Sequence, residues 1–224
     1  MNALTEYLEK YALISLEKQE KLARLIDGQM VVNVDFDAGR LHFSDGPEFR
    51  FQVLGTESDN TLNWLWAWAE EQEDINADLL TSALQMKEWG AKAGIPECIV
   101  PSVDLEKADG HILSLIASEV CAASCYYQDS YDGGASFLLL FGGELERQPG
   151  FDVAGLSRQF SNLLALYDLN HRNAFVSYLQ AKGLPFTEQG MIIKFELESA
   201  EQVSTEFGPD GVLRSINGRS LPLD

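Results

Sequence analysis

A run of eight residues, 62–69, places three of the chain's four tryptophans at every second position, in the order Leu-Asn-Trp-Leu-Trp-Ala-Trp-Ala. Because side chains alternate between the two faces of a β-strand, we expect Trp64, Trp66 and Trp68 to share one face with Leu62. The other face carries leucine and alanine, so the strand is apolar on both sides and belongs in the middle of a sheet. Burial of three indoles removes roughly 600 Å² of apolar surface from water. At about 25 cal/mol per Å², this contributes at most about 15 kcal/mol to the free energy of folding. This wall of tryptophans forms either protein core or the lining of a ligand cavity.

The charge of the chain narrows the classes of partner. Its 224 residues include 35 acidic and 16 basic side chains, which gives a formal net charge of −19. A surface of that sign repels nucleic-acid phosphates and anionic lipids, and the sequence has no cluster of lysine and arginine. We therefore expect no nucleic acid and no membrane among the partners. The charge favours a basic protein as partner, although an acidic surface also keeps a protein soluble without any partner.

The three cysteines, Cys98, Cys121 and Cys125, form an odd set without a paired Cys-x-x-Cys motif. We interpret them as reduced thiols of a cytosolic protein, with Cys121 and Cys125 on one apolar helix as small hydrophobic residues. The N-terminus does not read as a secretion signal, and apolar runs such as 137–141 are far shorter than the ~20 residues of a membrane helix. The sequence therefore predicts a cytoplasmic protein with no metal site and no cofactor.

Apolar residues repeat every three or four positions in some segments and every second position in others. This pattern predicts an α+β protein, with an antiparallel sheet centred on the tryptophan strand and helices packed on one face of it. The expected strands include 32–36, 41–43, 49–53, 62–69 and 137–141, with a hairpin turn at 37–39 and with Arg50 and Gln52 at polar positions of the third strand. The expected helices are 3–26, 75–93, 110–125, which Asp109 caps, and a pair within 153–182.

A boundary is expected at Gly142-Gly143 and the polar residues that follow, up to Gly150. We expect an α+β domain over residues 1–143 and a C-terminal extension over 144–224. The extension is predicted to contain the helix pair and an antiparallel meander. The sequence leaves open whether the two parts share one sheet or core.

The sequence contains no phosphate-binding loop, dinucleotide fingerprint, nucleophile elbow or zinc-protease motif, and its three histidines are scattered. We therefore predict no catalytic residues. The one constellation with chemical potential is the acidic run Glu70, Glu71, Glu73 and Asp74, directly after the tryptophans. These carboxylates either begin a helix, where its dipole favours negative charge, or include one whose pKa is raised beside the indoles to suit general-acid catalysis.

One resemblance rests on the stretch 52–58, Gln-Val-Leu-Gly-Thr-Glu-Ser, followed by Trp-Leu-Trp-Ala-Trp-Ala at 64–69. These motifs resemble those of a family of uncharacterised bacterial proteins known only as a domain of unknown function. Its members also have a helix that ends in glycine and a later Tyr-Tyr pair. Gly90 or Gly94 and the tyrosines at 126–127 match these features.

The resemblance covers roughly residues 5–143 and implies no activity. Members often have asparagine at the position of Glu70, which argues against a catalytic glutamate shared by the family. Besides the plainer reading that residues 144–224 block or support a partner surface in a larger assembly, two hypotheses follow. The first is a non-catalytic binding protein that presents an acidic face to a basic protein partner, in the manner of an immunity protein. The second is an enzyme or small-ligand binder with a tryptophan-lined pocket edged by carboxylates; in either case the candidate binding residues are Trp64, Trp66, Trp68, Glu70, Glu71, Glu73 and Asp74.

Overall fold

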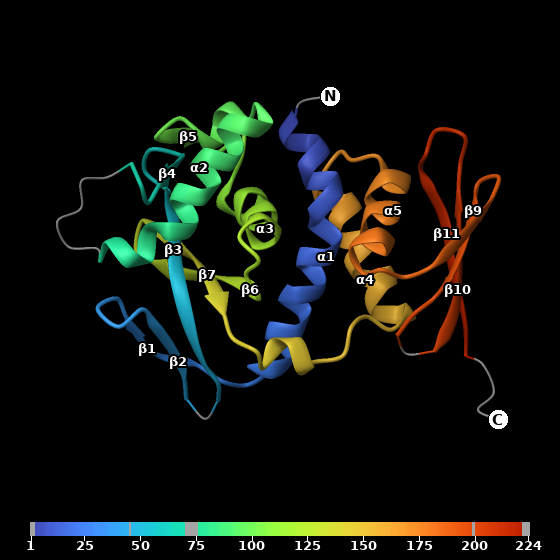
Figure 1. Cartoon of the computed structure of the whole chain (residues 1–224), viewed down its shortest axis with the longest axis horizontal. Coiled ribbons are helices and arrows are strands. Elements are labelled where there is room, and N and C mark those ends of the chain that lie inside the picture. The colour runs from blue at the N-terminus through green and yellow to red at the C-terminus, as the bar shows by residue number, and fades with distance from the viewer. Residues whose placement is uncertain (1–2, 45, 70–75, 199, 221–224) are drawn as a thin grey trace. The chain divides into compact units, whose positions relative to one another are not determined.

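A computed structural model describes residues 3–44, 46–69, 76–198 and 200–220 (Figure 1). These residues divide into two compact units. Unit 1 consists of Lys18–Gln148 with the described residues before Thr5, and unit 2 consists of Thr5–Glu17 with those from Pro149 onward. The α+β class is confirmed, because helices accompany two antiparallel sheets within the described ranges. A compact unit is not the same as an independently folding domain. The expected domains over 1–143 and 144–224 therefore stay a prediction.

Unit 1 contains the larger sheet, which is built around β3. The strand β3 pairs with β7 along one edge, while β2 and β4 share its other edge. β1 pairs with β2, β5 with β4 and β6 with β7. The centre of the sheet therefore lies one strand away from the tryptophan strand, which is β4. The strands are β1 (Val31–Asp35), β2 (Arg40–Phe43), β3 (Glu48–Ser58), β4 (Asn63–Trp66), β5 (Ser102–Asp104), β6 (Cys125–Tyr131) and β7 (Gly134–Phe141).

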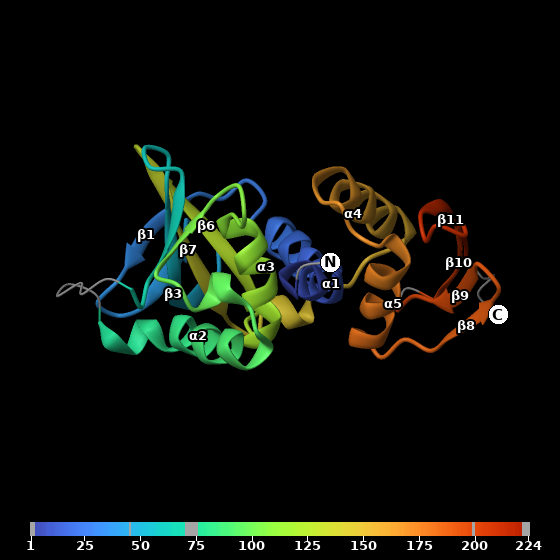
Figure 2. The same cartoon turned by 90° about the horizontal axis from the view of Figure 1, so that it is seen from above.

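Two helices of unit 1 pack against β3 and against each other, and Figure 2 shows them on the same side of the sheet. One is α2 (Thr81–Ala93), which continues from the 3-10 turn η1 (Ala77–Leu80), and the other is α3 (Gly110–Val120). Two further 3-10 turns are η2 (Pro96–Cys98) and η3 (Leu145–Arg147). None of the helices in the described ranges is long and apolar enough to cross a membrane.

The end of α3 differs from the sequence prediction. The helix stops at Val120, Ala122 takes a left-handed φ of 51°, and Cys125 already begins β6. The predicted helix over 110–125 was therefore too long, and Cys121 and Cys125 do not share a helix. The chain turns here because the backbone amide of Ala123 bonds to the carbonyl of Ser118 at 2.9 Å instead of continuing the helix.

The C-terminal part of α1 (Ala3–Leu25) belongs to unit 1. Leu22 is buried in a core cluster with the aromatic residues Phe43, Phe49 and Phe51 of β2 and β3. Lys18 donates a hydrogen bond to the carbonyl of Ala123 at 2.9 Å. The helix is therefore held to unit 1 by apolar packing and by a lysine that satisfies a carbonyl in the turn after α3.

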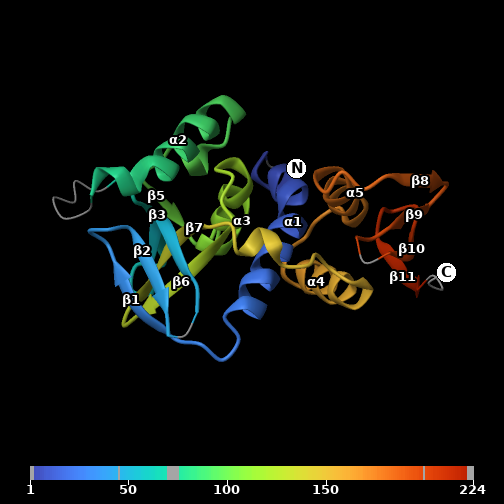
Figure 3. The same ribbon diagram turned by 60° about the horizontal axis from the view of Figure 1, so that its bottom comes forward.

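Unit 2 combines Thr5–Glu17 with two helices and a four-stranded meander, and Figure 3 shows both helices on the same side of that sheet. Its core is aromatic: Phe175 is fully buried, and its ring lies 5.3, 5.5 and 5.8 Å from those of Phe160, Phe195 and Phe207, measured between centroids. The elements are α4 (Val153–Leu166), α5 (His171–Ala181), β8 (Phe186–Gln189), β9 (Ile192–Glu196), β10 (Glu201–Phe207) and β11 (Leu213–Ser220).

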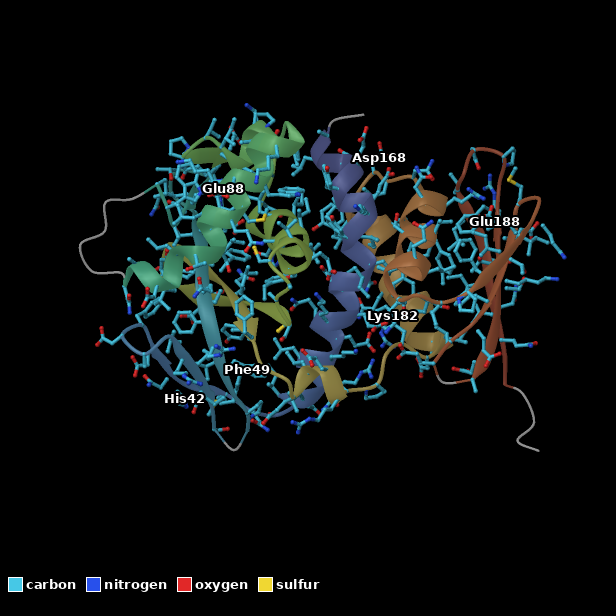
Figure 4. The ribbon with its side chains drawn as sticks, viewed as in Figure 1. His42, Phe49, Glu88, Asp168, Lys182 and Glu188 are labelled. Atoms are coloured by element: carbon cyan, nitrogen blue, oxygen red, sulfur yellow. The ribbon has the colours of Figure 1, made fainter. Side chains whose placement is uncertain are left out.

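A buried carboxylate joins α1 to α5 within unit 2. Glu17 is 2% exposed and accepts hydrogen bonds from Tyr178 Oη at 2.6 Å and from Lys182 Nζ at 2.8 Å. Lys182, labelled in Figure 4, also forms an ion pair with Glu198 at 3.0 Å. Burial and the adjacent Glu17 raise the pKa of Tyr178, so its hydroxyl stays protonated and donates. Burial alone lowers the pKa of Lys182, but the hydrogen bonds to Glu17 and Glu198 outweigh it and leave that pKa above its usual value.

Replacing Glu17 with alanine is expected to lower the free energy of unfolding by about 3 kcal/mol, because it removes the buried acceptor of Tyr178 and Lys182. This loss is at the lower end of the range expected when a buried ion pair loses one partner, because Glu198 remains beside Lys182. Urea denaturation followed by circular dichroism measures the change. Glu6→Ala, an exposed position on the same helix, is the control and should cost less than about 1 kcal/mol. Equal losses in the two variants would contradict a stabilising role for Glu17.

Candidate functional site

A cavity of about 470 Å³ lies in unit 1, where the β1–β2 hairpin meets η1 and α2. We call it the hairpin cavity. Its lining comes from the hairpin (37–40), from β3 (50–52), from the η1–α2 segment between residues 76 and 85, and from Cys121 and Phe141. The volume lies within the roughly 300–1,000 Å³ of small-molecule sites in proteins.

The hairpin turn forms one wall of the cavity. Asp35 Oδ1 accepts a hydrogen bond from Ala38 N at 2.8 Å, and Gly39 completes the turn with a left-handed φ of 63°. A methyl group at Gly39 would lie 2.7 Å from Leu79 Cδ2 of η1. Any other residue here is therefore strained and requires the side chain of Leu79 to shift. The turn predicted over residues 37–39 is confirmed, and glycine allows it to close against η1.

Gln52 fixes another part of the lining, the η1–α2 segment. Its Nε2 donates to the carbonyl oxygen of Asp78 at 2.8 Å, and its Oε1 accepts from the backbone amide of Ser82 at 3.2 Å. One side chain of β3 thus binds both η1 and the first turn of α2. Because a half-buried amide that loses such partners costs free energy, the start of α2 is held over the strand.

Two arginines lie on the sheet side of the cavity. Arg40 of β2 and Arg50 of β3 are directly opposite each other, and Phe141 of β7 is the next cross-strand neighbour of Arg50. Residues opposite each other in an antiparallel pair share one face, so the three side chains leave the sheet together. Arg40 forms an ion pair with Glu48 at 2.8 Å. Arg50 is exposed, and its side chain has neither an ion pair nor a hydrogen bond among the residues that the structure describes.

The thiol in the cavity lining is a poor nucleophile. Burial raises the pKa of Cys121 to about 11, against a lowering by its hydrogen bond to Ser82, so at neutral pH the thiol is protonated and a poor nucleophile. The described lining includes no histidine. Three metal-ligating side chains gather nowhere in the described parts of the chain.

Two tryptophans of the predicted wall lie in the core of unit 1, and the third, Trp68, is half-buried. Trp64 and Trp66 are fully buried, with ring centroids 5.4 Å apart, and Trp66 Nε1 donates to the carbonyl of Glu97 at 2.8 Å. Trp68 follows the strand, stacks on Trp66 and has Lys87 Nζ 3.8 Å from its ring centroid. None of the three tryptophans is among the described residues that line the hairpin cavity.

Gly55, in the Leu-Gly-Thr part of the motif, provides the space for this packing. A methyl group there would lie 2.3 Å from Trp64 Cζ2 and 2.5 Å from the carbonyl oxygen of Leu65. Leu62 does not join the wall as expected, since it precedes the strand with a φ of 50° and is 63% exposed.

The carboxylates predicted beside the tryptophans, Glu70, Glu71, Glu73 and Asp74, lie outside the described residues. The binding site predicted from the tryptophans and these carboxylates stays a prediction.

Sequence analysis did not identify Arg40, Arg50 and Gln52 as site residues. It placed Arg50 and Gln52 at the polar positions of an alternating strand, which is correct but typical of any solvent-facing residue. The register of the β2–β3 pair would have placed Arg40 opposite Arg50. The position of η1 and α2 over these residues is a tertiary feature that the pattern does not contain.

The model of a family of unknown function (DUF6882) matches residues 5–143. The chain belongs to this family. The expected membership of a family of unknown function is thereby confirmed. No curated protein and no solved structure matches the chain. In this member of DUF6882 the described lining of the hairpin cavity lies entirely within the matched residues, whereas unit 2 beyond α1 lies outside them.

The order in which the three cysteines are labelled tests whether Cys121 lies at the cavity. We expect iodoacetamide to label Cys121 before Cys98 and Cys125 in the native protein, because Cys121 is 9% exposed and lines the cavity while the other two are fully buried. Its labelling rate should rise about tenfold per pH unit in alkaline solution until the pH approaches the raised pKa. Time-resolved peptide mass spectrometry measures the order of labelling. Faster labelling of Cys98 or Cys125 would contradict the placement of these thiols.

Proposed function

We propose that the chain acts as a non-catalytic binding protein and that the hairpin cavity holds a small-molecule ligand. The observation that carries this proposal is the combination of a cavity of about 470 Å³ with the unpaired Arg50 guanidinium on one wall and the Gln52-held η1–α2 segment on the other. Small-molecule sites are concave and combine apolar surface with a few fixed polar groups.

The lining supports binding of an amphipathic molecule. Leu79 and Phe141 supply apolar surface, while Arg50, Thr81 and Gln85 supply polar groups. Gln85 is held in place because its Nε2 donates to the carbonyl of Val120 at 2.8 Å. Such fixed groups reduce the entropy that a site loses when a ligand binds.

Filling the cavity should abolish ligand binding. In a thermal-shift screen of a chemically diverse metabolite library, a ligand at about 100 times its Kd should add about 2.7 kcal/mol and raise Tm by about 5–10 °C. Thr81→Trp places an indole at an exposed position of the lining and should remove this shift. Ala91→Trp, an exposed position further along α2 that does not line the cavity, should keep it.

Two results would contradict the proposal. One is a library in which no compound stabilises the wild-type protein, and the other is equal stabilisation of the Thr81→Trp and Ala91→Trp variants. Circular dichroism of both variants without ligand establishes that each is folded.

A second candidate function is supported by charge: an acidic face that binds a basic protein partner. The excess of 35 acidic over 16 basic side chains leaves carboxylates exposed in both units, among them Glu88 in unit 1 and Asp168 and Glu188 in unit 2, all labelled in Figure 4. The acidic run predicted from the sequence, Glu70, Glu71, Glu73 and Asp74, is the proposed centre of this face.

Association with such a partner should depend steeply on salt. A basic protein captured from native lysate at low ionic strength, identified and purified, is expected to bind about tenfold more slowly at physiological ionic strength. Neutralising the four residues of the acidic run should slow binding further than neutralising four exposed carboxylates elsewhere in unit 1, namely Asp27, Glu106, Asp132 and Glu144. Stopped-flow kinetics measures both effects. A rate independent of ionic strength would exclude this function, and equal effects of the two variants would exclude the acidic run as its centre.

A further inference from the structure

The charge of Arg50 is uncompensated within the described part of unit 1. Arg50 stands directly opposite Arg40, and like charges in this arrangement destabilise a strand pair. Arg40 is neutralised by Glu48 at 2.8 Å, but no described carboxylate pairs with Arg50 although the chain has 35 acidic residues. A guanidinium offers two parallel N–H donors, the geometry that fits a carboxylate. An incoming carboxylate at Arg50 would both satisfy these donors and remove the repulsion from Arg40.

The other end of the hairpin cavity has the opposite charge. Asp37 in the hairpin turn and Asp78 in η1 are exposed, line the cavity, and have no ion pair among the described residues. The contact between the hairpin and η1, seen in the closeness of Gly39 to Leu79, brings these two segments together. The two carboxylates therefore form an acidic end of the cavity.

The distance between the two ends follows from β3. The backbone of Asp78 is bonded to the side chain of Gln52 at 2.8 Å. Arg50 is the next residue of β3 on the same face, about 7 Å from Gln52 along the strand. The basic and the acidic end are therefore about one small molecule apart, and Phe141, the cross-strand neighbour of Arg50, adds an apolar surface at the basic end.

We infer that the hairpin cavity takes a dipolar ligand of the amino-acid or short-peptide class, whose free carboxylate binds Arg50 and whose free ammonium binds the Asp37–Asp78 end. The inference rests on the proposed function of the cavity. A simple anion meets two repelling carboxylates, and a simple cation meets Arg50. A molecule that carries both charges satisfies both ends, because each charged group gains an opposite partner.

The test uses the full chain and a defined set of probes: the twenty free amino acids, their dipeptides, and the N-acetyl and C-amide derivatives of every member. Thermal shift identifies binders and isothermal titration calorimetry measures their affinities. We expect at least one free amino acid or dipeptide to bind. Its N-acetyl and C-amide derivatives should each bind about 10- to 100-fold more weakly, the size expected for the loss of one charge-assisted hydrogen-bonded pair.

Two variants assign the ends of the ligand. Arg50→Gln should weaken the free probe about 10-fold or more and should leave little difference between it and its C-amide. The double variant Asp37→Asn, Asp78→Asn should also weaken the free probe about 10-fold or more and should leave little difference in affinity between it and its N-acetyl derivative. Arg147→Gln and Glu88→Gln remove exposed charges of unit 1 outside the cavity and should change neither affinity by more than about twofold.

The outcomes separate this inference from the proposed function. If binders appear in the diverse metabolite library but all of them lack one of the two charges, or if N-acetyl derivatives bind as tightly as free probes, the dipolar ligand is wrong while the cavity remains a binding site. If the free probes bind Arg50→Gln and the wild type equally, the assignment of the carboxylate to Arg50 is wrong. If neither set contains a binder, both the inference and the proposed function fail.

Discussion

The hydrogen bonds of the Gln52 amide are the interaction on which the arrangement of unit 1 depends. One side chain of the central strand satisfies the carbonyl of Asp78 and the amide of Ser82, and thereby holds η1 and α2 over the sheet. The cavity exists because these elements are held above β3 without closing on it. An apolar residue of the same size would remove both bonds and leave the carbonyl of Asp78 with only the Thr81 hydroxyl, at 3.2 Å.

Other residues of β3 position further parts of unit 1. Gly55 lets Trp64 lie against the strand, and the Glu57 carboxylate accepts a hydrogen bond from the amide of Gly110 at the start of α3. Arg50 supplies the charge of the cavity. A single strand therefore sets the positions of the aromatic core, of both helices and of the candidate site, although its sequence reads as an ordinary alternating strand.

Local patterns were sufficient to predict most elements, because apolar period, turn residues and caps all act within a few positions. The hairpin at 37–39 and the cap of α3 at Asp109 are examples. The end of α3 was missed because Ala122 takes a left-handed conformation that its side chain does not favour and that only the tertiary structure imposes. The cavity was missed because it also depends on the tertiary structure. The register of the β2–β3 pair places Arg40 opposite Arg50, and the position of η1 over β3 completes the lining.

The buried pairing of Glu17 with Lys182 also has a consequence for biosynthesis. The two residues are 165 positions apart, so at the usual rates of translation the first emerges on the order of ten seconds before the second. Throughout that interval the N-terminal half of α1 lacks the rest of unit 2. Its apolar residues Leu8 and Leu13, buried in the finished protein, must then stay in solution on a nascent chain, where Glu6, Glu9 and Lys10 keep the segment charged.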